Sequence, residues 1–333
     1  MSNMNTKKWI AAIAALLVAV IAVWFLSSDT QRESDALTVA YAPYTSNLPV
    51  FVAEDYGIDD SLGLDLQLQK RSSSREMLVS AVEGQVDVAA PVSLVSILGA
   101  ASRGSSLKIS LLASEAKGSG VSHILVQENS QIGEVGDLKG KSVGTYTSDA
   151  GLASTRAILR SVGIKLEDIE GGRVEQLPPT EIARAITNGQ LDAAFLIEPF
   201  ATSALMQPTV RSLIEDPRSK YITSPYPVGG QVFTIDFVEE SPVKARQFHK
   251  IILAATEYIQ NNPQDAMRSL EKWTNMSQEV AKKSIKAKLY VWEEPDEPLK
   301  ESTQRVAELM REEEAIAEIP NLNEMWWDVS KGI

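Results

Sequence analysis

The chain has 333 residues, of which 44% are hydrophobic, 23% are charged and none is cysteine. This length exceeds one small domain, and the even composition excludes a disordered or fibrous chain, so we expect two domains. The absence of cysteine excludes disulfides, thiolate metal sites and a cysteine nucleophile. Two histidines leave little for a His-based metal site, and no cofactor is expected. The formal charge of -12 disfavours nucleic acid as a partner, because phosphate would be repelled.

The amino-terminal segment predicts the compartment. Residues 9–26 carry no charge, and a bilayer core of ~30 Å needs about 20 apolar helical residues. Lys7 and Lys8 precede this stretch, which predicts that residues 1–8 stay in the cytoplasm and that the rest lies in the periplasm. The stretch ends in Trp24-Phe25-Leu26, which is bulky where a signal peptidase requires small side chains. We therefore favour a retained signal-anchor in the inner membrane over a cleaved signal peptide.

Residues 27–36 are polar and predict a linker. After the linker, short apolar runs alternate with helical patterns, which predicts an α/β fold with mostly parallel sheets. Strands are expected at Leu37–Tyr41, Leu64–Leu68, Val86–Ala90 and Ile109–Ala113. Helices are expected at Leu48–Tyr56, Met77–Val82 and Leu94–Ala101.

A second unit with the same alternation begins near residue 123. Its expected strands are His123–Gln127, Ser142–Tyr146, Val174–Leu177 and Ala193–Ile197, and its expected helices are Gly151–Val162 and Thr180–Asn188, the latter with Thr180 as N-cap. One more strand is expected at Val232–Phe237. The tail predicts helices at Pro242–Gln260, Pro263–Trp273, Gln278–Leu289 and Glu301–Ala317.

Two short motifs repeat between the units. Gly84–Ala89 (GQVDVA) matches Gly189–Ala194 (GQLDAA), and Leu62-Gly63-Leu64 matches Val162-Gly163-Ile164. This predicts two lobes of like topology in which each glycine ends a helix in a left-handed conformation. The loop after each repeated strand then lies at the carboxyl edge of its sheet, where open α/β folds bind ligands.

Several segments resemble the solute-binding proteins of ABC importers, in the nitrate, sulfonate, taurine and thiamine-pyrimidine group. They are Leu48–Gly57 (LPVFVAEDYG), Gly63-Leu64-Asp65, Gly84–Ala89, Asp137–Gly144 (DLKGKSVG) and Leu177–Glu181 with Gly189–Pro199. The resemblance covers about residues 37–317. It implies the type II periplasmic-binding-protein fold, whose two lobes close on a ligand and deliver it to a permease with its ATPase.

The resemblance also implies a division of the chain. Residues 37–122 and 225–333 are expected to form lobe 1, and residues 123–224 lobe 2. The crossovers are expected near Ala116–Ser122 and Ser224–Gln231, where Gly118, Gly120, Gly229 and Gly230 would serve as hinge residues.

Polar residues at expected helix starts are candidate ligand contacts. Tyr44-Thr45-Ser46-Asn47 follows the first strand, Thr147-Ser148 holds the same position in the second unit, and Ser72 with Ser73 precedes another helix. Hydroxyls and unpaired backbone N–H groups at a helix start can hold an anionic or polar ligand. Ordinary helix capping is the alternative for each of them.

Pro91, Ser93, Glu198 and Gln231 complete the expected site. A carboxylate at Glu198 could accept hydrogen bonds from a ligand amine or hydroxyl, or instead hold backbone at the crossover. Asp149, beside Ser148, places negative charge near a helix start and favours a neutral or cationic ligand. The expected loops hold no cluster of basic residues, which disfavours an inorganic anion. The expected ligand is therefore a small organic molecule, sulfonate, taurine-like or pyrimidine-like, and no catalytic or metal-binding residue is expected.

Two other functions stay open at this point. A membrane-tethered accessory protein that senses a ligand would suit the anchor, although the sequence has no output domain. An enzyme on the same fold would be dehydratase-like or pyrimidine synthase-like. The absence of cysteine argues against the synthase, and the apolar segment argues against the cytoplasmic dehydratase.

The segment at residues 293–318 is acidic. It holds ten acids and three bases, which favours a solvated helix face over a docking surface.

Overall fold

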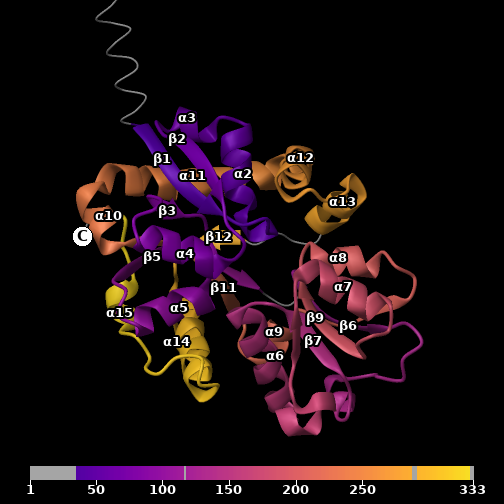
Figure 1. Ribbon diagram of the computed structural model, residues 1–333. Coiled ribbons are helices and arrows are strands. Elements are labelled where there is room, and N and C mark those ends of the chain that lie inside the picture. The colour runs from indigo at the N-terminus through magenta and orange to yellow at the C-terminus, as the bar shows by residue number, and fades with distance from the viewer. Residues whose placement is uncertain (1–34, 116–117, 287–290, 331–333) are drawn as a thin grey trace, which may run out of the picture.

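The computed structural model describes residues 35–115, 118–286 and 291–330, and Figure 1 shows two α/β lobes side by side. Buried apolar side chains form two clusters. One takes residues from Leu37 to Val121 and from Tyr226 to Trp327, and the other from Ile124 to Val210. We call these parts lobe 1 and lobe 2. The boundaries given above, at residues 122/123 and 224/225, remain a prediction.

The expected membrane segment at residues 9–26 and the linker up to residue 34 lie outside the described residues, and β1 begins at Ala36. Within the part of the chain that is described, no helix combines the length and the apolar character needed to cross a bilayer.

Lobe 1 contains two sheets. The strand order of the parallel sheet is β2-β1-β3, formed by β1 (Ala36–Tyr41), β2 (Asp65–Lys70) and β3 (Val88–Ala89). The other sheet, β12-β5-β11-β4, is antiparallel and consists of β4 (Val92–Ser93), β5 (Leu107–Glu115), β11 (Tyr226–Thr234) and β12 (Val291–Glu293). Strands from both ends of the sequence therefore share one sheet.

Lobe 2 has one mixed sheet in the order β10-β6-β9-β7-β8. Its strands are β6 (Ser122–Gln127), β7 (Val143–Tyr146), β8 (Glu175–Leu177), β9 (Ala193–Ile197) and β10 (Val210–Glu215). β6 runs antiparallel to both β9 and β10. The expectation of mostly parallel sheets was therefore wrong, because the strands that carry the chain between the lobes run against their neighbours.

Helices cover these sheets (Figure 1). Lobe 1 has α2 (Leu48–Asp55), α3 (Ile58–Ser61), α4 (Ser74–Val82), α5 (Leu94–Ser102), α10 (Ile235–Glu240), α11 (Pro242–Asn261), α12 (Pro263–Thr274), α13 (Gln278–Lys286), α14 (Glu297–Glu312) and α15 (Leu322–Met325). Lobe 2 has α6 (Asp149–Ser161), α7 (Pro179–Thr187), α8 (Phe200–Leu205) and α9 (Pro217–Tyr221).

Several expected elements differ from the structure in their bounds. The helix expected at Glu301–Ala317 is α14, and the end of the one expected at Gln278–Leu289 lies outside the described residues. Thr180 is not the N-cap of its helix, because α7 begins one residue earlier at Pro179, whose fixed φ suits a first helical position. The strand expected at Val232–Phe237 ends at Thr234, whose hydroxyl accepts a hydrogen bond from Phe237 N at 3.2 Å and so caps α10. No element was expected at α3, β4, α8, β10, α9, β12 or α15, and α10 was expected to continue a strand.

The repeated motif makes the same local structure in both lobes. Gly84 and Gly189 have φ of 69° and 70°, as expected for glycines that end helices. The motif's aspartate then binds the start of the neighbouring strand. Asp87 Oδ2 accepts from Thr38 N and Oγ1, both at 2.6 Å, and Asp192 Oδ2 accepts from Ser142 N and Oγ, both at 2.9 Å. Each aspartate thus fixes a pair of strands whose carboxyl ends face the junction of the lobes.

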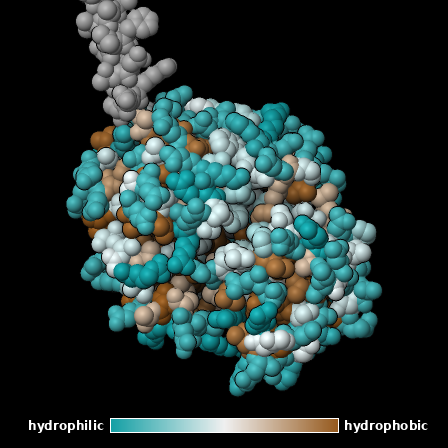
Figure 2. Space-filling view, viewed as in Figure 1, coloured by the Kyte–Doolittle hydropathy of each residue, from teal (hydrophilic) through white to brown (hydrophobic). Residues whose placement is uncertain are grey.

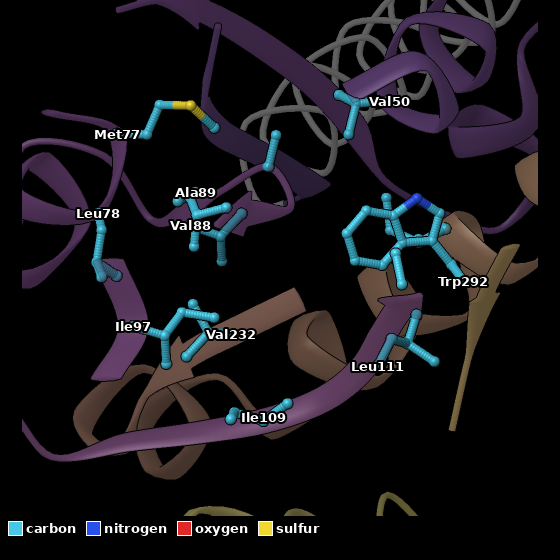
Figure 3. Close-up of a cluster of buried hydrophobic side chains, with 14 of the residues drawn as sticks. Val50, Met77, Leu78, Val88, Ala89, Ile97, Ile109, Leu111, Val232 and Trp292 are labelled. Carbon is cyan, nitrogen blue, oxygen red and sulfur yellow. The ribbon is translucent and has the colours of Figure 1, made fainter. Parts of the chain in front are cut away.

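The tail of the chain completes the core of lobe 1. Figure 3 shows buried side chains from α2, α4, α5, β3, β5, β11 and β12 in one cluster. Trp292 of β12 is 2% exposed and belongs to it. Phe248 of α11 and Val306 of α14 belong to the same cluster.

Part of the acidic segment pairs with the other lobe. Arg160 of α6 lies 2.6 Å from Glu313 Oε1 and 3.3 Å from Glu312 Oε2, at the end of α14. The Glu313 side chain is 8% exposed, and burial raises its pKa. These acids therefore contribute to an ionic contact between the lobes.

We expect Arg160→Gln to lower the free energy of unfolding by about 0.5–1 kcal/mol, because the arginine is half exposed and screened by water. Urea denaturation measures the change. Lys165→Gln is the control, since its partner Glu167 lies within lobe 2 and both side chains are exposed. If both substitutions lower the free energy of unfolding equally, the contact between the lobes does not stabilise the protein.

Candidate functional site

A cleft of about 520 Å³ lies between the lobes and takes residues from both. Its lobe 1 wall comes from the starts of α4 and α5 and from β11, and its lobe 2 wall from the starts of α6 and α7. On the face shown in Figure 2 the surface is mostly hydrophilic, and apolar residues show between the lobes. A volume of this size suits a small organic molecule.

Four helices begin at this cleft, and serines cap three of them. Ser73 Oγ accepts from Glu76 N at 3.2 Å, Ser93 Oγ from Ser96 N at 3.3 Å, and Ser148 Oγ from Gly151 N at 2.8 Å. The fourth helix, α7, begins at Pro179. The first turn of a helix has backbone N–H groups without an intrahelical partner and carries the positive end of the helix dipole. Four helix starts at one cleft therefore stabilise negative charge, and the Asp149 carboxylate in the lining opposes this effect.

Arg218 of α9 brings a cation to the cleft. The residue is 4% exposed. Its Nε and Nη2 donate to Glu115 Oε2 at 2.9 and 2.6 Å. The guanidinium carbon lies 5.7 Å from the ring centre of Phe195 and 5.1 Å from that of Tyr226. Arg218 is thus a rigidly held donor group at the inner side of the cleft.

An exposed ion pair bridges the lobes at the rim of the cleft. Arg75 Nη1, in the first turn of α4, lies 3.8 Å from Asp149 Oδ2, at the first position of α6. The two side chains are 64% and 58% exposed, so water screens their attraction.

Seven of the twelve predicted contact residues line the cleft, and ligand contact by them remains a prediction: Tyr44, Ser46, Ser72, Ser73, Ser93, Thr147 and Ser148. Helix capping and ligand contact, the two interpretations of the serines at helix starts, are compatible, because the capping serines also line the cleft. Tyr44 is partly buried, and burial raises the pKa of its hydroxyl to about 12. This hydroxyl donates to the Ser72 carbonyl at 3.4 Å.

The other five predicted residues lie outside the lining, and three of them bond to backbone groups, Thr45 across the two lobes. Thr45 Oγ1 donates to the Glu198 carbonyl at 3.1 Å. Asn47 accepts from Ala42 N at 2.8 Å and donates to the Pro91 carbonyl at 2.7 Å. Gln231 is fully buried and donates to the Val232 carbonyl at 3.2 Å. Their amides and hydroxyls thus already bond backbone groups, and ligand contact by Thr45, Asn47 and Gln231 remains a prediction.

The fourth of these residues, Pro91, accepts the hydrogen bond from Asn47 through its carbonyl. The fifth is Glu198. Glu198 is 3% exposed, accepts from Thr202 Oγ1 at 3.0 Å, and has His123 Nε2 3.7 Å from Oε1. Burial raises the pKa of Glu198 to about 7 and lowers that of His123. The structural alternative for Glu198 therefore fits its position better than ligand binding.

The sequence reading missed Arg218, Trp292 and Gly229 in the cleft lining. Gly229 was expected at a hinge, but it lies within β11, and a Cβ there would stand 2.6 Å from the Val92 carbonyl oxygen. Its role is close approach of β11 to β4. Gly118 and Gly120 do lie in the first crossover and have φ of 81° and 65°.

A protein-family model described as NMT1/THI5 like matches residues 45–266. A curated relative, an aliphatic sulfonates-binding protein of Escherichia coli (strain K12), is 36% identical over 90 residues. That alignment spans 27% of this chain and 27% of the relative, about a quarter of its length.

Solved structures match over most of the chain. The periplasmic aliphatic sulphonate binding protein SsuA of Escherichia coli superposes with a TM-score of 0.76 at 18% identity, covering 88% of this chain and 92% of that one. The alkanesulfonate-binding protein SsuA of Xanthomonas axonopodis pv. citri, bound to MOPS, gives a TM-score of 0.70 at 15% identity, covering 88% and 98%. At these identities the likeness establishes the α/β fold of periplasmic binding proteins.

Proposed function

The chain belongs to the NMT1/THI5-like family, and on this premise we propose that it is an extracytoplasmic solute-binding protein that delivers a small organic anion to an ABC importer. One observation carries the proposal. Four helix starts and the buried Arg218 meet at one cleft between two lobes. A ligand held there contacts both lobes at once and favours the closed form that an importer recognises.

A sulfonate suits this arrangement. Its three oxygens accept hydrogen bonds in different directions, which matches donors that come from several helix starts and from a guanidinium. The aliphatic part of the molecule would lie against Val92, Val228 and Trp292. The sulfonate-binding relative and the two sulfonate-binding structures support this choice of ligand class.

The test is a binding screen with the purified full-length chain in detergent. Methanesulfonate, ethanesulfonate, taurine, MOPS and nitrate are added singly, and the melting temperature and binding heat are recorded. We expect at least one sulfonate to raise the melting temperature and to titrate to saturation, because a ligand that binds only the native state stabilises it. A screen in which no sulfonate binds would refute the sulfonate assignment, and binding of nitrate alone would replace it with an inorganic anion.

Asp149 gives a sharper prediction about the ligand. We expect Asp149→Asn to strengthen binding of ethanesulfonate about two- to fivefold, because it removes a negative charge from the first turn of a helix that faces the cleft. Taurine carries an additional ammonium group, so it should gain less or lose affinity. Calorimetric titration of both ligands measures the difference. Asp137→Asn, in lobe 2 but outside the cleft lining, is the control and should change neither.

We also propose that residues 9–26 tether the protein to the inner membrane and that the ligand leaves unchanged. The apolar sequence supports the tether, and the binding-protein relatives support the absence of turnover. Carbonate extraction of membranes tests the first point, because a tethered chain stays in the pellet at full mass. Mass spectrometry of the ligand recovered after incubation tests the second.

A further inference from the structure

Glu115 occupies the point at which the chain leaves lobe 1. It is the last residue of β5 and is fully buried. Its Oε2 accepts from Ser122 Oγ at 2.6 Å, in addition to the two bonds from Arg218, and its Oε1 accepts from Ser219 N at 3.2 Å. One carboxylate therefore collects four donors, and both of its oxygens are used.

These donors come from both crossings of the chain between the lobes. Ser122 is the first residue of β6, directly after the first crossing. Arg218 and Ser219 belong to α9, directly before the second crossing, and β11 then begins at Tyr226 in lobe 1. The Arg218 guanidinium lies between Phe195 of lobe 2 and Tyr226 of lobe 1. Glu115 thus joins lobe 1 to two separate segments of lobe 2.

We propose that Glu115 is a positioning residue that holds Arg218 against the ligand cleft and, through the same carboxylate, fixes the angle between the lobes. The first part rests on the proposed function, since it takes Arg218 as a ligand contact. The second part needs no ligand. Charge-assisted bonds to the Nε and Nη2 of one guanidinium restrict its orientation far more than a single neutral bond does. A change at Glu115 therefore reaches the cleft and the crossings together.

The absence of cysteine in this chain makes the lobe angle measurable. Val79→Cys on α4 and Arg184→Cys on α7 place two spin labels on exposed positions of helices that both begin at the cleft, one in each lobe. Pulsed dipolar spectroscopy of the full-length chain then gives the distribution of distances between the lobes, without ligand.

We expect Glu115→Gln to broaden this distribution or to shift its maximum, because neutral Gln cannot accept from all four donors. Ser122→Ala removes one of the four bonds without changing a charge, so it should broaden the distribution less and serves if Glu115→Gln does not fold. Glu175→Gln is the control, since its partner Arg173 is an exposed residue of the same lobe. Distributions that are unchanged in both Glu115→Gln and Ser122→Ala would overturn the proposal.

A second arm measures ethanesulfonate affinity at 10 °C, on the variants that a thermal unfolding curve shows to be folded at that temperature. We expect Glu115→Gln to weaken binding at least about tenfold, as for loss of a charged hydrogen-bonding partner. Glu115→Asp keeps the charge and should recover part of the affinity, which a loss of packing alone would not explain. If the wild type binds no sulfonate, the sulfonate assignment fails, and the distance measurement still decides the role of Glu115.

Discussion

Arg218→Met is expected to destabilise the protein by about 3–5 kcal/mol, because it leaves the Glu115 carboxylate buried without its cation. The substitution also removes the guanidinium from between the rings of Phe195 and Tyr226. Urea denaturation of the full-length chain at pH 7 measures the loss as a lower transition midpoint.

Removing both charges should undo much of this loss. In the double variant Glu115→Met with Arg218→Met, no charge stays buried, and a hydrophobic pair of similar volume is often close to neutral in stability. Arg173→Met is the control, since the Arg173–Glu175 pair is exposed and should contribute well below 1 kcal/mol. A single substitution at Arg218 that costs no more than the one at Arg173 would show that the buried pair does not stabilise this fold.

The features that were predicted from sequence depend on neighbours along the chain. Ser73 and Ser148 cap helices because a serine before a helical pattern supplies an acceptor to the third residue on, whatever the rest of the fold does. Gly84 and Gly189 end helices for a similarly local reason, since only glycine reaches positive φ easily. The two lobes and several cleft residues follow from such signals once the helix starts are placed at the sheet edges.

The features that were missed depend on residues far away in sequence. Arg218 faces the cleft because Glu115, 103 positions earlier, orients it, and no local pattern carries that information. The sequence did not show whether the Glu198 side chain faces the cleft, for another reason. β9 is buried on both faces, so apolar residues do not alternate along it and the pattern does not show on which side the next residue lies. Continuous apolar runs likewise hide strand direction, which is why the antiparallel β5 and β11 were not recognised.

Glu198 should make stability fall as the pH rises from about 5 to 8. Burial raises its pKa from 4.5 to about 7, so in this interval the folded protein keeps a proton that the unfolded chain has lost. The unfolded state binding fewer protons means that the free energy of unfolding decreases with pH. The shift corresponds to about 3 kcal/mol, which is present at pH 4.5 and lost above pH 7.

Glu198→Gln isolates this contribution because Gln does not titrate. The change in hydrogen bonding to Thr202 costs the same at every pH, so the comparison between pH values removes it. His123, 3.7 Å away, acts in the opposite direction: burial lowers its pKa, so the folded state gains stability as the pH rises through 6.5. We therefore compare the free energy of unfolding of Glu198→Gln with that of the wild type by urea denaturation. We expect this difference to shift in favour of the variant by about 3 kcal/mol between pH 5 and pH 8. Glu167→Gln, at an exposed position, is the control, and its free energy of unfolding should change with pH as that of the wild type does. A Glu198→Gln profile that is also parallel would mean that the buried carboxyl ionises as it does in water.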